Sequence, residues 1–477
     1  MSRCKYTNFF SEIGTFFQKS GDSALQAIAN ALQGIGLTDR SLGLSTKGNA
    51  SRKTSEKLLA LLLLPFFGCS DVSHLPGSAL SALSRVGYNM LYRMERDPNI
   101  DWRKCMARLS KRVEKYLSAR CAESDTGIRC LVADDTDIAK SGMKIEKIGR
   151  IFSHTQHRHI IGFKGLLLGI TDGKTFRPLD SSLHGEAGRD GTQGLSAKQR
   201  KARKQTALAD GTPAKARHDE YLRSKIAVLI EMVRRARRNG TEFEYLLVDS
   251  WFMCRELAQA VLRLSGGSHV LGMLKNNVNI FAVGGERLRT GQMVSRFRHQ
   301  SRRCRKYRCE YIVVDTALGD IPVRLFLCRR SKSDGWKTIL TTDTSLSFVR
   351  AYEIYAMHWS IEVCFKECKQ YLRLEGNQAQ HFNSQTASVS VCLMQYTLLN
   401  VVKRMTSYET LGGLFRDTKA DVVEITLYER ILLVLREILE EFTEYLGFPN
   451  KELVQRLLSD NDLLVKIQNS NCLRLCA

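Results

Sequence analysis

Apolar residues in the first part of the chain recur at spacings of three and four. The pattern runs through four segments that polar residues or glycines separate: 9–17, 24–37, 58–67 and 80–94. A basic amphipathic segment follows from Asp101. Because this spacing places apolar side chains on one face of a helix, residues 1–125 are predicted to be helical and to lack strands.

The pattern changes at Gly127, where short apolar runs typical of strands begin. Strands are predicted at 128–135, 159–170, 174–183, 244–249 and 269–274, and helices at 221–238 and 256–264. Residues 186–218 are polar, basic and rich in glycine, so we expect a mobile loop there. Residues 276–345 alternate apolar and polar positions between glycine turns, which predicts a β-rich segment.

A helix is predicted over 354–369, because neither proline nor glycine interrupts this stretch. An apolar stripe on one of its faces would anchor it in a core. The neighbouring face carries a phenol, an imidazole, a carboxylate and an ammonium group: Tyr355, His358, Glu362 and Lys369. Helices are predicted from there to the end of the chain, most clearly at 422–445 and 451–467.

The order of these elements predicts an α/β protein in four parts. Residues 1–125 would form a helical N-terminal DNA-binding domain. A catalytic domain would comprise 126–275 and 346–405, interrupted by a β-rich insertion at 276–345. Residues 406–477 would form a helical region for dimerisation or DNA contact.

The charge balance adds a partner to this picture. The chain of 477 residues has 72 Lys and Arg against 49 Asp and Glu, a net charge of +23. A surplus of this size is typical of proteins that bind nucleic acid. The basic run at 198–204, with Lys198, Arg200 and Lys201, is predicted to contact phosphates.

Composition also argues against other classes of protein. The longest apolar run, 58–67, is too short to span a bilayer and contains a proline, so no membrane partner is expected. The 14 cysteines lack the paired short spacings of a zinc ribbon. A reducing cytoplasmic location, in association with the nucleoid, is therefore expected.

Three carboxylates stand at positions suited to metal binding. Asp135 lies at the end of the first strand, Asp249 at the end of the strand that follows the crossover helix, and Glu362 on the late helix. Mg²⁺ and Mn²⁺ prefer such oxygen ligands. Asp134 and Asp137 compete with Asp135. Alternation along a strand puts Asp135 and Asp137 on one face and Asp134 on the other, and does not choose among them.

With these motifs the chain resembles bacterial insertion-sequence transposases of the DDE type. The resemblance is to the cut-and-paste group with a Tyr-x2-Arg-x3-Glu-x6-Lys signature, present here as Tyr355, His358, Glu362 and Lys369. It covers roughly 128–405. It implies a ribonuclease-H-like catalytic domain with a β-strand insertion, flanked by helical regions. It also implies the triad Asp135, Asp249 and Glu362, because the first Asp of the family directly precedes a Thr.

The resemblance implies further partners and roles. Two Mg²⁺ ions, or Mn²⁺, would be held by the triad, and Tyr355, Lys366 and Lys369 would contact DNA. His358 replaces the Arg of the signature and would hold phosphate less firmly, so we expect His358→Arg to strengthen binding of DNA ends. The DNA partners would be terminal inverted repeats and target DNA, bound by a homodimer in the synaptic complex, and strand cleavage would pass through a hairpin.

The sequence thus predicts a DNA transposase that performs metal-dependent strand cleavage and strand transfer. Two alternatives remain open at this point. One is a structure-specific nuclease of the same fold, and the other is a DNA-binding relative without catalytic activity.

Overall fold

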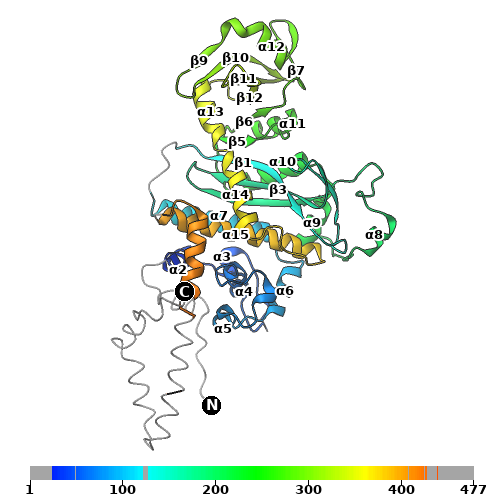
Figure 1. Ribbon diagram of the computed structural model, residues 1–477, viewed down its shortest axis with the longest axis vertical. Coiled ribbons are helices and arrows are strands. Elements are labelled where there is room, and N and C mark those ends of the chain that lie inside the picture. The colour runs from blue at the N-terminus through cyan, green and yellow to red at the C-terminus, as the bar shows by residue number, and fades with distance from the viewer. Residues whose placement is uncertain are drawn as a thin grey trace, which may run out of the picture.

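A computed structural model describes residues 24–48, 50–121, 127–406, 408–423, 425–426 and 438. The helix predicted at 9–17, the one at 451–467 and nearly all of the one at 422–445 lie outside these residues. Within the described ranges the chain is a mixed α/β protein built around one large sheet (Figure 1). No helix in these ranges is long and apolar enough to cross a membrane.

The N-terminal part is helical. Its helices are α2 (Ala24–Ile35), α3 (Asp39–Leu42), α4 (Thr54–Leu63), α5 (Ala79–Ser84), α6 (Tyr88–Arg96) and α7 (Trp102–Ser118). The segment predicted as one helix over 80–94 is two helices, because the left-handed Arg85 ends α5 and Gly87 precedes α6. Asp101 caps α7 by accepting a hydrogen bond from the Lys104 backbone amide.

The central sheet begins with antiparallel strands and continues with parallel ones. β1 (Cys130–Ala139) pairs antiparallel with β3 (Arg158–Thr171), which also pairs with β2 (Gly149–Ser153) and β4 (Phe176–His184). On its other side β1 runs parallel to β5 (Tyr245–Val248), and β5 runs parallel to β6 (His269–Leu274). The crossover helices are α10 (Lys225–Arg238) and α11 (Arg255–Leu262). Five of these six strands and both crossover helices lie close to their predicted positions, whereas β2 was not predicted.

The β-rich segment continues the central sheet. β12 (Lys337–Thr341) pairs with β6, and β11 (Ile321–Arg329), β10 (Cys309–Leu318) and β9 (Arg302–Cys304) follow outward, so the sheet has ten strands. A separate hairpin of β7 (Ile280–Val283) and β8 (Glu286–Arg289) precedes α12 (Thr290–Phe297). In Figure 1 this part lies at the top, beyond β6.

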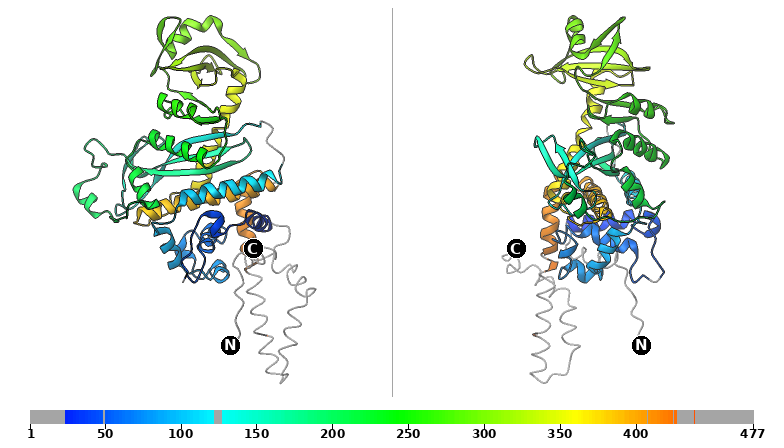
Figure 2. Two further views of the ribbon diagram at one scale, coloured as in Figure 1. Left: turned by 180° about the vertical axis from the view of Figure 1, so that it is seen from behind. Right: turned by 90° about the vertical axis from the view of Figure 1, so that its right-hand side faces the viewer.

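Two apolar cores cover the two faces of β1. Leu131 and Ala133 pack into the core that contains α10 and α11, whereas Cys130 and Val132 face the core formed with the N-terminal helices and the late helices. The late helices are α13 (Phe348–Ala356), α14 (Trp359–Tyr371) and α15 (Phe382–Met405). α7 and α15 run side by side between the sheet and the other N-terminal helices (Figure 2).

Two predictions about local structure are wrong. Residues 186–218 contain α8 (Ala197–Ala202), capped by Ser196, and α9 (Pro213–Glu220), capped by Thr212. The helix predicted over 354–369 is broken between α13 and α14 at Met357 and His358. The backbone amides of Met357 and His358 bond to carbonyls three residues earlier, which is the tighter pattern of a 3₁₀ turn.

Candidate active site

The carboxylates of β1 divide between the two faces of the sheet. Asp134 lies two positions after Val132, so both side chains lie on the same face, against which α14 packs. Asp135 lies on the opposite face, with α10, because side chains alternate along a strand. The structure therefore separates the two neighbouring carboxylates that the sequence could not rank.

Asp135 is held by a cation from α10. Its Oδ2 lies 2.7 Å from Nζ of Lys225, and the same Nζ lies 4.1 Å from the ring centroid of Trp251. Asp137, on the same face as Asp135, forms an ion pair with Lys164 of the neighbouring strand. Both carboxylates thus have a cationic partner within the chain, and neither is on the face of Glu362.

Asp249 follows β5 directly and lies beside Asp134. The last paired positions of the two parallel strands are Ala133 and Val248, so Asp134 and Asp249 are the next residues in register. Adjacent strands lie about 4.8 Å apart. The Oδ1 of Asp249 accepts hydrogen bonds from the backbone amides of Trp251, at 2.8 Å, and Phe252, at 3.3 Å. This turn fixes the carboxylate at the end of the strand.

Glu362 lies in the first turn of α14, and its charge reaches the other two carboxylates. Burial and the Asp249 carboxylate raise the pKa of Glu362 above its ordinary value. Burial raises the pKa of Asp134 to about 8, and the charges of Asp249, Asp135 and Glu362 add to that rise. Like charges that raise the pKa values of one another are a mark of a site that accepts a cation.

The three side chains do not yet form a closed ligand set. Among the described residues, no three His, Cys, Asp or Glu side chains are placed to hold one metal ion. No ion pair in those residues includes Asp134, Asp249 or Glu362, in contrast to Asp135 and Asp137. The carboxylate oxygens and the repulsion between the three charges fit a divalent cation. To bind one ion together, the side chains or α14 must move closer to one another.

Tyr355 adjoins this carboxylate cluster, which consists of Asp134, Asp249 and Glu362. Burial and the charges of all three carboxylates raise the pKa of the Tyr355 phenol above its ordinary value. The phenol therefore stays protonated at neutral pH and can donate a hydrogen bond. Its ring stacks on that of His358, with 5.5 Å between centroids and 18° between planes.

His358 is placed differently from what the signature suggests. It is only 5% exposed, and burial lowers the pKa of its imidazole, so the ring is neutral. The ring hydrogen-bonds to the backbone of Ala133, and its Nε2 has no hydrogen-bond partner. A buried neutral ring does not have the charge or the exposure of a phosphate ligand.

The remaining predicted DNA contacts fall into two groups. Lys366 is exposed on α14, and Lys369 on the same helix lies 3.1 Å from Glu375. Lys198 and Lys201 are exposed on α8, whereas Arg200 donates a hydrogen bond to the Leu195 carbonyl at 2.8 Å. In Figure 1, α8 lies at the right of the view and α14 near its centre, so the two groups of residues lie apart.

Comparisons with known proteins give a family and one similar structure. No curated protein matches the sequence. A solved structure, a piggyBac transposase synaptic complex with hairpin DNA, is similar over 96% of this chain and 86% of that chain. Its TM-score is 0.42 at 11% sequence identity.

The family is identified by the sequence itself. The model of the DDE superfamily endonucleases matches residues 50–296, about half of the chain, which includes Asp134 and Asp249 but ends before Glu362. Members of this superfamily in general use divalent metal ions. The chain belongs to the DDE superfamily endonuclease family.

Proposed function

We propose that this protein is a DNA transposase whose active site consists of Asp134, Asp249 and Glu362. The observation that supports this most strongly is that these three carboxylates, which lie far apart in sequence, are placed on one face of the sheet, where the Asp249 carboxylate raises the pKa values of both Asp134 and Glu362. Asp134 replaces Asp135 in the triad that the sequence predicted, because Asp135 is paired with Lys225 on the opposite face.

We propose a ribonuclease-H-like core for this site. The order of elements supports that assignment: antiparallel strands come first, and a crossover to parallel strands follows. A late helix then brings the last carboxylate to the sheet. The residues would hold Mg²⁺ or Mn²⁺, which supplies an activated oxygen and neutralises charge on phosphate during in-line displacement. We propose two such ions in each active site.

The side chains of this chain would position the scissile phosphate. Tyr355 donates a hydrogen bond to a phosphate oxygen, and Lys366 and Lys369 supply positive charge from α14. In cleavage, the oxygen of water bonds to phosphorus and the bond from phosphorus to the 3′-oxygen breaks, which leaves a 3′-hydroxyl and a 5′-phosphate. In strand transfer, the oxygen of that 3′-hydroxyl bonds to the phosphorus of a second phosphodiester and gives up its proton. The bond from that phosphorus to its own 3′-oxygen breaks, and the displaced oxygen takes a proton to leave a new 3′-hydroxyl. His358 supports Tyr355 and is no longer proposed as a phosphate ligand.

Nicking of supercoiled plasmid in Mg²⁺ tests the activity. We expect the wild-type protein to nick, and Glu362→Gln to lose nicking while its DNA binding, measured by fluorescence anisotropy, is retained. Binding without Mg²⁺-dependent nicking by the wild-type protein would favour an inactive DNA-binding relative.

A nuclease without strand transfer is the second candidate, because the family is defined by endonuclease activity. Joining of pre-cleaved DNA ends to plasmid separates the two, since only a transposase performs it. The same proposal includes four further features: the use of terminal inverted repeats, a hairpin pathway, assembly as a homodimer and association with the nucleoid. Short inverted repeats on both sides of the coding region, bounded by a target duplication, would support it.

A further inference from the structure

A groove of about 500 Å³ lies between α7, β4 and the C-terminal half of α10. Its apolar floor includes Leu179 and Met232. Ile170 of β3 also lines the groove and pairs with Leu131 of β1. Leu131 lies three residues before Asp134, and β1 is two strands away from β4. Measured along the sheet, at about 3.3 Å per residue and 4.8 Å per strand, the groove lies on the order of 15 Å from Asp134. Ile170, Leu179 and Met232 pack on the α10 face of the sheet, so the groove opens on the face opposite the carboxylate cluster.

The lining of this groove is strongly basic. Cationic side chains outnumber acidic ones there by seven to three. Lys104 and Lys111 of α7 and Arg238 of α10 are exposed and form its rim. Lys104 and Lys111 lie two turns apart on the same face of α7, about 10 Å along the helix axis. DNA presents one phosphate per strand every 3.4 Å along its axis, so this rim matches several successive phosphates.

The positive charge extends into the buried wall. Arg177 is 9% exposed, and its Nε has no hydrogen-bond partner. Its Nη2 lies 3.5 Å from Glu114 Oε1, and that carboxylate also pairs with Arg129. Burial lowers the pKa of Arg177 only to about 10, so it remains charged at neutral pH.

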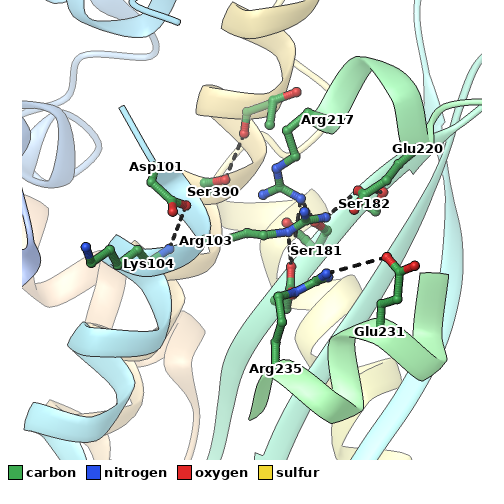
Figure 3. A network of polar contacts seen from close by, with 12 residues as sticks. Asp101, Arg103, Lys104, Ser181, Ser182, Arg217, Glu220, Glu231, Arg235 and Ser390 are labelled. Atoms are coloured by element: carbon green, nitrogen blue, oxygen red, sulfur yellow. Dashed lines mark hydrogen bonds and ion pairs between the residues drawn. The ribbon is translucent and has the colours of Figure 1, made fainter. Parts of the chain in front are cut away.

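A network behind the groove fixes two more arginines. Arg103 and Arg235 contact opposite oxygens of Asp180, at 2.7 and 2.8 Å. Figure 3 shows both arginines close to Arg217. These arginines are neutralised by carboxylates, because Glu220 also pairs with Arg103 and Glu231 also pairs with Arg235. The network therefore fixes the wall, and the net positive charge of the groove comes mainly from its rim.

We propose that this groove binds the phosphate backbone of double-stranded DNA, away from the cut and without reading its sequence. The choice of DNA as the anion rests on the proposed function. The basic face of α7 and the end of α10 would act together, so the N-terminal helices and the catalytic sheet would grip one duplex jointly. Phosphate contacts of this kind supply affinity that depends on salt and not on base sequence.

The main test removes the rim charges with Lys104→Ala, Lys111→Ala and Arg238→Ala in one protein. Binding of a fluorescent duplex of arbitrary sequence is measured by anisotropy, without metal, at several salt concentrations. We expect affinity to fall about 10-fold or more at 100 mM salt, and the slope of log affinity against log salt to decrease by about 3, near 0.9 per lost contact. An unchanged slope would overturn the proposal.

A matched control removes the same charge elsewhere. Lys47, Arg263 and Lys332 are exposed and do not line the groove. Their triple substitution by Ala should lower affinity much less than the rim variant. Equal losses would show that only net charge matters, which contradicts a groove.

Glu114→Gln tests the opposite direction. This change removes a negative charge that faces Arg177 and keeps the shape, so we expect the duplex to bind several-fold more tightly. General damage to the fold would not tighten binding, whereas unchanged or weaker binding would contradict a role for the groove wall.

Two further measurements identify the ligand and separate this inference from the proposed function. Inorganic polyphosphate should compete with the fluorescent duplex for the wild-type protein more strongly than for the rim variant. Equal competition in both proteins would mean that the groove does not bind phosphates. Single-stranded DNA or RNA bound more tightly than duplex would exclude duplex as the partner. Glu362→Gln should bind duplex normally through the groove, so loss of nicking alone leaves this inference intact, and loss of groove binding alone leaves the active site intact.

Discussion

Two aspartates on strands of the same sheet meet opposite surroundings. Asp180 of β4 is buried, and although burial alone would raise its pKa, Arg103, Arg235 and Arg217 hold the pKa below its ordinary value. Asp134 of β1 is surrounded by carboxylates, and burial together with Asp249 raises its pKa to about 8. The chain thus supplies three cations to one aspartate, while no ion pair within the described residues includes the other.

The difference separates a carboxylate that is paired within the chain from one that could accept a cation. A buried charge paired by its own chain stabilises the fold once it is fully hydrogen-bonded, and removal of one partner leaves the others uncompensated. A buried carboxylate that faces only like charges destabilises the isolated protein and is compensated when a cation binds. Each prediction below would break or sharpen this contrast.

The largest expected effect is on stability. Asp180→Asn leaves Arg103, Arg217 and Arg235 without their shared anion, and Arg217 is buried, so we expect the free energy of unfolding to fall by about 3–5 kcal/mol. Chemical denaturation followed by circular dichroism measures it. Glu231→Gln, at the partly exposed edge of the same network, should cost less than about 1 kcal/mol. Similar losses in both variants would show that Asp180 is not the centre of the network.

The next effect separates the neighbouring carboxylates of β1. Asp134→Asn should reduce Mg²⁺-dependent nicking by at least about 100-fold, because a ligand of the ion that stabilises charge is lost. Asp135→Asn, which affects only the pair with Lys225, should reduce it by about 10-fold at most. Initial rates of plasmid nicking at equal protein concentration measure both. The reverse order would restore Asp135 to the triad.

A pH effect concerns His184, which is buried at the end of β4. Burial lowers its pKa to about 4, whereas an unfolded His has a pKa near 6.5. The unfolded chain therefore takes up a proton below pH 6.5 that the folded chain refuses, and stability falls as the pH falls toward 4. Between pH 6.5 and pH 5 the loss is about 1.6 kcal/mol.

Denaturation at several pH values checks this effect in wild type and in His184→Gln. The substitution should flatten the dependence over that range, since Gln does not titrate. An equally steep dependence in the variant would assign it to other groups.

The smallest effect is stabilisation by metal. At ten times its dissociation constant, Mg²⁺ should raise the free energy of unfolding of the wild-type protein by about 1.4 kcal/mol, since it binds only the folded chain. Asp134→Asn should lose this gain, whereas Asp135→Asn should keep it. Thermal melting with and without Mg²⁺, at constant ionic strength, measures it. A gain that persists in Asp134→Asn would place the metal elsewhere.

Much of the fold could be predicted from alternation alone. The strands that carry Asp134 and Asp249 and the crossover helix α10 lie close to their predicted positions, because buried strands and amphipathic helices have distinct periods. The helices α8 and α9 were missed, although Ser196 with Gln199 and Thr212 with Pro213 are recognisable start signals.

The site could be predicted only in part. Alternation correctly placed Asp134 and Asp135 on opposite faces, but which face α14 covers is a tertiary fact that no local pattern contains. The break at His358 has the same origin, since its ring is drawn into the core against Ala133 of β1. The pairing of Lys225 with Asp135 joins residues 90 positions apart and left no signal in the sequence.

The most direct test of the central claim is the position of Mn²⁺ in crystals of the protein bound to DNA, located by anomalous scattering. The account predicts a peak about 2.0–2.3 Å from carboxylate oxygens of Asp134 and Asp249, with Glu362 closed onto the same ion or its neighbour. A peak held by Asp135 with Asp134 turned away, or Mn²⁺ bound only elsewhere, would contradict it.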